Sequence, residues 1–142
     1  MKSIYALFFI VLIASCTTKK SEKETSNRWA KLDGFHTVMA DAFHPYKDSG
    51  NLVPAKELVN TLSDSAGVWA EATLPEKVNN QDMVNKLLNL KLSTVELLKM
   101  KIDNTPDSVF ATQLTKVHDS FHEIQETWYK SGKKEEGEHK DH

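Results

Sequence analysis

Apolar residues recur with helical spacing in four stretches of this chain, and the pattern is clearest near the C-terminus. There the apolar positions are separated alternately by four and three residues: Phe110, Leu114, Val117, Phe121, Ile124 and Trp128. This spacing keeps all of them on one face of an α-helix. Thr105 can cap the start of the helix, and Pro106 suits its first turn. We therefore predict an amphipathic helix from Pro106 to about residue 130, with this apolar stripe in the core.

Three earlier stretches repeat the helical pattern. Residues 26–44 place the following side chains on one face: Leu32, Phe35, His36, Met39, Ala42 and Phe43. We expect Pro45 and Gly50 to close that helix after His44. A second helix is predicted over residues 54–72, where Pro54 suits a first turn. A third is predicted over residues 83–102, with Asp82 as N-cap and a core face that includes Met83, Leu87, Leu90, Leu97 and their neighbours.

The fold class follows from these four helices. No segment alternates with a period of two residues, so we expect no strands. Helices of about 18 to 25 residues joined by short connections favour an antiparallel up-down-up-down four-helix bundle. This all-α domain should span residues 26–130, and the polar residues 131–142 should form a disordered tail.

The first residues of the chain have the pattern of a targeting segment. Lys2 precedes an apolar run over residues 4–14, and Cys16, the only cysteine, follows the sequence Ile-Ala-Ser. The run is far shorter than the roughly 20 residues that a membrane-spanning helix needs. The pattern resembles that of bacterial lipoproteins, which implies a signal peptide over residues 1–15, a lipidated Cys16 and a tether over residues 16–25. We therefore expect a lipid anchor to hold the domain in the bacterial cell envelope, at the periplasmic face or outer membrane.

Charge and composition exclude several classes of function. With 18 basic and 20 acidic residues, the chain offers no basic patch for nucleic acid. Lipidation of Cys16 leaves no thiol for a disulfide, a thiolate metal site or a nucleophile. We also find no Gly-rich phosphate loop, no setting for a serine or cysteine nucleophile and no Glu-x-x-His repeat. We therefore expect a protein that is not an enzyme.

Four histidines in the predicted bundle are the main candidates for chemistry. His118 and His122 are four residues apart on the last helix. At this spacing the two Cβ atoms lie about 6 Å apart, so both imidazole rings can bind one metal ion. His36 falls inside the apolar face of the first helix, one turn before Met39. His44 lies about 12 Å further along that helix, too far to bind the same ion.

The predicted bundle places the first and last helices side by side, so His36, His118 and His122 should converge. Met39 and His44 are secondary candidates, and Asp119 or Glu123 is a possible further ligand. Imidazoles suit copper or zinc, and a thioether favours copper.

Residues 114–124 (LTKVHDSFHEI) also carry a family resemblance. A fourth amphipathic helix with this sequence, and an inward methionine on the first helix, resemble cytochrome c prime and the soluble periplasmic b-type cytochrome. Leu114 and Val117 stand where cytochrome c prime has its haem-attachment cysteines, and His118 stands at its axial ligand. The resemblance implies that haem, if bound, is non-covalent haem b held by Met39 and His118 or His122. The chain is also similar to small bacterial envelope proteins that carry His-x-x-Met on a first helix, His-Pro at its end and His-x-x-x-His on the last helix. The matching residues here are His36 and Met39, His44 and Pro45, and His118 and His122.

Three functions remain open from the sequence. The first is a lipid-anchored envelope protein that binds copper or zinc through its histidines for buffering, delivery or sensing. The second is electron transfer through haem b. The third is a non-catalytic envelope interaction or stress protein whose histidines are incidental surface groups.

Overall fold

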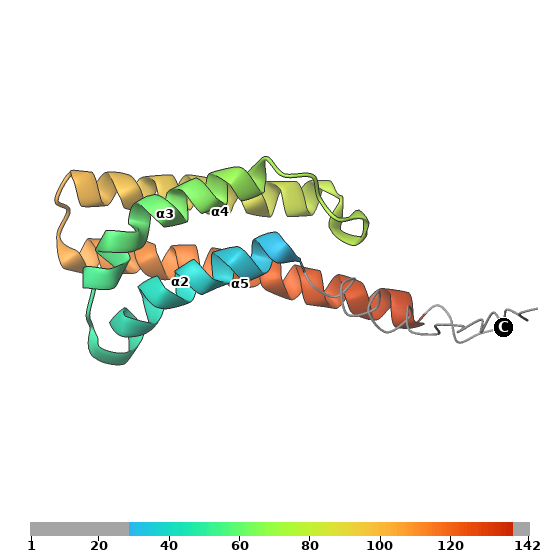
Figure 1. The fold of residues 1–142 in the computed structure, drawn as a ribbon, viewed down its shortest axis with the longest axis horizontal. Helices are drawn as coiled ribbons and strands as arrows, with labels where there is room; N and C mark the ends of the chain where they lie inside the picture. The colour runs from blue at the N-terminus through green and yellow to red at the C-terminus, as the bar shows by residue number, and fades with distance from the viewer. Residues whose placement is uncertain (1–28, 138–142) are drawn as a thin grey trace, which may run out of the picture.

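Four α-helices and one short 3-10 helix make up the computed structural model, which describes residues 29–137. They are α2 (Ala30–Ser49), α3 (Val53–Ala70), η1 (Glu76–Val78), α4 (Gln81–Ile102) and α5 (Asp107–Gly137). Figure 1 shows α3 and α4 along one side of the domain and α2 and α5 along the other. The described residues contain no strand, so the all-helical prediction is confirmed for them. The predicted signal peptide, Cys16 and the tether lie outside the described residues.

The predicted end of the first helix is wrong. α2 does not stop at His44 but continues through Pro45 to Ser49. A proline inside a helix removes one backbone donor, and α2 nevertheless continues past Pro45, where Tyr46 lies edge-on to the ring of Phe43. The helix ends at Gly50, whose left-handed backbone (φ 72°) lets its N–H donate to the carbonyl of Tyr46.

The helix starts also differ in detail from prediction. Asn80, and not Asp82, caps α4: its Oδ1 accepts a hydrogen bond of 3.0 Å from the N–H of Met83. Asn80 has the extended backbone that an N-cap requires, whereas Asp82 is already helical and pairs with Lys86. α5 begins at Asp107 and continues to Gly137, into the segment that we expected to be a tail.

The core forms where the predicted apolar stripes meet. All six stripe residues of α5 are buried, as predicted. At one end of the core, the ring of Trp29 lies 5.1 Å from that of Trp69 and 5.2 Å from that of Trp128. The ammonium group of Lys77, in η1, lies over the ring of Trp128. The start of α2, the end of α3 and a later turn of α5 are thus joined by aromatic packing.

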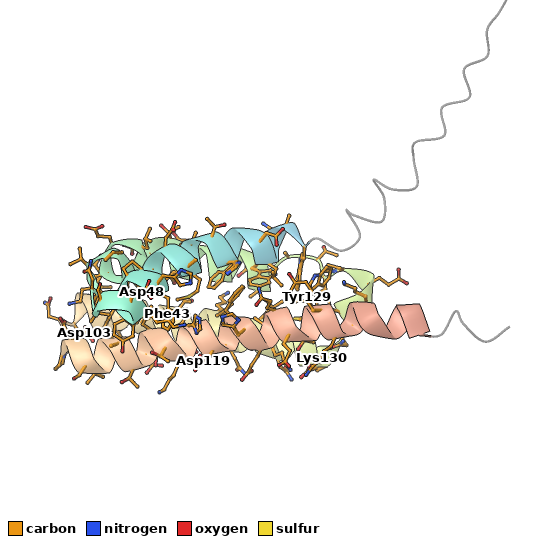
Figure 2. The ribbon with its side chains drawn as sticks, turned by 90° about the horizontal axis from the view of Figure 1, so that it is seen from below. Phe43, Asp48, Asp103, Asp119, Tyr129 and Lys130 are labelled. Carbon is orange, nitrogen blue, oxygen red and sulfur yellow. The ribbon has the colours of Figure 1, made fainter. Side chains whose placement is uncertain are left out.

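Ring contacts also relate α2 to α5, the two helices that carry the candidate histidines. Trp29 meets Trp128, Phe35 meets Phe121, and Phe43 meets His118. Residue numbers therefore rise along α2 while those of the contacting residues fall along α5. The same seam is seen from below in Figure 2, where Phe43 lies between the two helices.

Candidate functional site

His118 and His122 face each other one turn apart on α5. Their Nε2 atoms are 3.0 Å apart, and their rings are inclined at 69°. Two nitrogens bound side by side to one ion, each at about 2.0 to 2.1 Å, lie roughly 2.9 to 3.4 Å from each other. The two imidazoles therefore already have the separation that a shared metal ion requires.

The opposite nitrogen of each ring is held by a neighbouring side chain of α5. Nδ1 of His118 donates to Oδ1 of Asp119 at 3.1 Å, and Nδ1 of His122 donates to Oε1 of Gln125 at 3.0 Å. A neutral imidazole carries one N–H, so each Nε2 atom then presents a lone pair. Two lone pairs at 3.0 Å repel each other unless a proton or a cation lies between them. Metal-ligating histidines in proteins usually show this pattern, with the distal N–H given to a carboxylate or carbonyl oxygen.

An aromatic ring from α2 holds His118 in place. The ring of Phe43 stacks on it with a centroid separation of 3.8 Å and an angle of 16°. Phe43 is buried, whereas the His118 side chain keeps 22% of its surface exposed and His122 is exposed. The pair is thus fixed from the core side and open on the solvent side.

The local environment also favours the neutral form of His118. Burial lowers the pKa of His118 below its ordinary value, and the positive charges of His122 and Lys47 act in the same direction. The hydrogen bond that His118 donates to Asp119, and the negative charge of Asp119, oppose this shift and do not reverse it. The lone pair of His118 is therefore more available near neutral pH than that of an ordinary surface histidine.

The other sequence-predicted site residues lie elsewhere. The prediction that His36 lies inside the apolar face is wrong: His36 is exposed, and its ring stacks on that of Phe121 with the centroids 5.3 Å apart. Met39 is buried in the core, and His44 is exposed. Within residues 29–137, no group of three or more His, Cys, Asp or Glu side chains is placed to hold a metal ion. The structure thus brings together His118 and His122 without adding His36 to them.

Sequence reasoning missed two residues of this site and misjudged a third. The helical pattern places Phe43 only in the core and does not single out Gln125, although three residues after His122 is a spacing at which helix side chains meet. The pattern predicts Asp119 as a possible metal ligand, whereas in the structure it accepts the hydrogen bond that orients His118.

Within residues 29–137, the surroundings of His118 and Met39 give no support for a haem site. Nε2 of His118 points to His122, while Met39 lies within the packed core. Two surface pockets, of about 420 and 210 Å³, lie between α2 and α3 and beside the turn from α4 to α5. Neither pocket is lined by Met39 or by a histidine.

Comparison with known proteins gives no family or relative for this chain. A scan against protein-family models, a search of curated proteins and a search of solved structures each found no match. None of the helices in residues 29–137 combines the length and apolar character that crossing a membrane requires.

Proposed function

We propose that this chain binds a divalent transition-metal ion, copper or zinc, through Nε2 of His118 and Nε2 of His122. The observation that carries the proposal is the 3.0 Å separation of these atoms while both Nδ1 atoms donate hydrogen bonds elsewhere. Two lone pairs at this distance need a proton or a cation between them, and a transition-metal ion is a cation that imidazole nitrogens bind.

The ligand set narrows the choice of metal. Imidazole nitrogens suit zinc, copper and nickel, and at a given nitrogen site the affinity for divalent copper exceeds that for zinc. Two nitrogens at 3.0 Å subtend adjacent positions of a coordination sphere, as square-planar copper or tetrahedral zinc requires. We expect copper(II) to bind more tightly than zinc(II).

The openness of the site favours a role in buffering or delivery. Structural zinc sites are closed by four protein ligands, whereas a site with two protein ligands leaves positions for water or an incoming ligand. Such an ion can be captured and passed on without unfolding the protein. Catalysis is not part of this proposal.

The proposal also places the site in the cell envelope. We propose that Cys16 is lipidated and that the four helices form an up-down-up-down antiparallel bundle. The opposite directions of the residue numbers in the contacts between α2 and α5 support that order. A domain anchored in this way would hold its metal ion close to a membrane face.

A metal titration of the purified, untagged protein tests the proposal. We expect one equivalent of copper(II) or zinc(II) to bind in calorimetry and to raise the melting temperature, because an ion that binds only the folded state stabilises it. The double variant His118→Ala/His122→Ala should lose both effects.

Two matched double variants act as controls. His36→Ala/His44→Ala removes the two histidines of α2, and His139→Ala/His142→Ala removes the last two histidines of the chain. Both should retain binding at the parent stoichiometry. If the parent and the His118→Ala/His122→Ala variant bind metal equally, or if metal leaves the melting temperature of the parent unchanged, the proposal is wrong.

A further inference from the structure

The distance between the two site nitrogens discriminates between the two oxidation states of copper. Nε2 of His118 and Nε2 of His122 are 3.0 Å apart, which suits two adjacent positions around an ion. Two nitrogens on opposite sides of an ion, each about 2 Å from it, lie roughly 4 Å apart. Copper(I) held by two nitrogens alone takes this linear arrangement, whereas copper(II) takes adjacent corners of a square plane. The separation seen here therefore fits the oxidised ion.

The contacts of the two rings resist the widening that copper(I) would need. The ring of His118 stacks on that of Phe43 with centroids 3.8 Å apart, and its Nδ1 donates to Asp119. A turn of this ring would slide it off a buried side chain and break that hydrogen bond. The ring of His122 is exposed, and its Nδ1 donates to Gln125. Widening therefore has to come from His122, at the cost of its bond to Gln125.

The described residues place no sulfur ligand beside the pair. Thioether and thiolate sulfur are the ligands that favour copper(I). The methionines within residues 29–137 are Met39, Met83 and Met100. Met39 and Met83 are 1% and 0% exposed in the core, and Met100 lines a pocket that no histidine lines. Copper(I) at the pair thus gains no sulfur from these residues.

We propose that the His118–His122 site holds copper as the divalent ion and releases it when the ion is reduced to copper(I). This inference rests on the proposed function and names the form of copper that the site takes. One electron from a soluble reductant converts bound copper(II) into copper(I). The two metal–nitrogen bonds then break, both electron pairs stay on the imidazoles, and no covalent bond of the protein changes.

The same chemistry defines the partners of the site. The side chain of His118 is 22% exposed and His122 is exposed, so a small reductant can reach the ion from the solvent side. Copper(I) that leaves two nitrogen ligands moves to an acceptor with thioether or thiolate ligands, because those bind it more strongly. A zinc ion at the same site has no such route, since zinc is not reduced.

Separate affinities for the two oxidation states test the proposal. The full chain is purified without a tag and carries Cys16→Ser, because a free thiol binds copper(I). Competition against one dye for copper(II) and another for copper(I), the latter without oxygen, gives both dissociation constants. We expect copper(II) to bind about 100 times more tightly, which lowers the copper reduction potential by about 120 mV, at about 59 mV per factor of ten.

Reduction of the loaded protein is the second measurement. Each ascorbate gives two electrons to two bound copper(II) ions and two protons to water. Dialysis against ascorbate and the copper(I) dye should remove the copper. The zinc-loaded protein under the same treatment is the control and should keep its ion, because ascorbate does not change zinc.

A pair of glutamine variants tests whether the ring geometry causes the preference. Gln125→Ala frees the ring of His122, so copper(II) should bind more weakly and copper(I) should not. The ratio of the two affinities should therefore fall from about 100 to about 10. Gln81→Ala is the matched control: it removes an exposed glutamine of α4 that is bonded to Asn85, and it should keep the parent ratio.

The outcomes separate this inference from the proposed function. If the His118→Ala/His122→Ala variant binds copper(II) as the parent does, both are wrong. If copper(II) binding needs the two histidines but copper(I) binds equally tightly or more tightly, only the present inference is wrong. It is also wrong if Gln125→Ala keeps the parent ratio, or if ascorbate removes zinc as readily as copper.

Discussion

The two histidine pairs of this protein differ in what surrounds them, although each pair lies on a single helix. His118 and His122 on α5 have their Nε2 atoms 3.0 Å apart and both Nδ1 atoms hydrogen-bonded. His36 and His44 on α2 are eight residues apart and are both exposed. The difference teaches that a histidine pair becomes a candidate ligand set when its spacing matches one helical turn and its neighbours orient the rings. Two histidines on the same helix are not enough to form a candidate ligand set.

The largest expected effect comes from Phe121, the buried residue that touches both helices and a histidine of each pair. Its ring contacts Phe35 and Trp69 in the core, and also His36 and His122. We expect Phe121→Ala to lower the free energy of unfolding by about 3 to 5 kcal/mol, because it leaves a cavity. Urea denaturation of the metal-free protein measures this. The exposed neighbour Glu123→Ala should change the free energy of unfolding by less than about 0.5 kcal/mol.

Metal-induced stabilisation separates the two pairs most directly. At a free ion concentration about 100 times Kd, bound metal adds about 2.7 kcal/mol to the free energy of unfolding. His118→Ala should remove most of that gain, since one imidazole remains, while the metal-free protein should change little. His44→Ala should retain the full gain. Thermal melts with and without copper(II) measure the difference, and equal gains in the two variants would remove the distinction between the pairs.

The hydrogen-bond acceptors of His118 and His122 give a further test of the difference between the two histidine pairs. Asp119→Ala and Gln125→Ala each remove an acceptor that orients an imidazole, so each should weaken metal affinity by a factor of about 10 to 100. Asp48→Ala, an exposed acid on α2, should leave the affinity unchanged. Competitive titration against a metal-binding dye measures the three affinities. Unchanged affinity in Asp119→Ala and Gln125→Ala would mean that ring orientation does not matter here.

The smallest expected effect is a pH dependence of stability caused by His118. Its pKa in the folded state lies below the ordinary value of 6.5, so the unfolded chain binds more protons between the lowered pKa and 6.5. The free energy of unfolding should therefore rise with pH across this window and stay level above it. Urea denaturation between pH 5 and 8 should show a smaller rise in His118→Gln than in the parent. An equal rise in His118→Gln and in the parent would contradict the assignment.

The structure bears out the part of the fold that depends on local pattern. The spacing of Phe110 to Trp128 predicted the buried face of α5, and every residue of that stripe is buried. The errors occur where contacts between helices compete with local preference. Pro45 lies inside α2, and several apolar residues of α4, among them Leu88 and Leu92, remain exposed, because a helix of this bundle buries only the face that its neighbours cover.

The candidate site also has one part that the sequence predicts and another part that depends on contacts between helices. A spacing of four residues places His118 and His122 together on any helix, so this pairing could be predicted from residue order. Stacking of Phe43 on His118, and of His36 on Phe121, depends on how α2 and α5 are rotated toward each other. No periodicity within one helix encodes that rotation.

By itself, then, the amino-acid sequence determined the helical class, the approximate helix positions and the pairing of two imidazoles on α5. These follow from interactions between residues that are at most a few turns apart. Only the tertiary structure decided that His36 stays outside the pair and that α4 exposes a second set of apolar side chains. The reason is physical: the side of each helix that becomes buried is set by the packing of all four helices around one core.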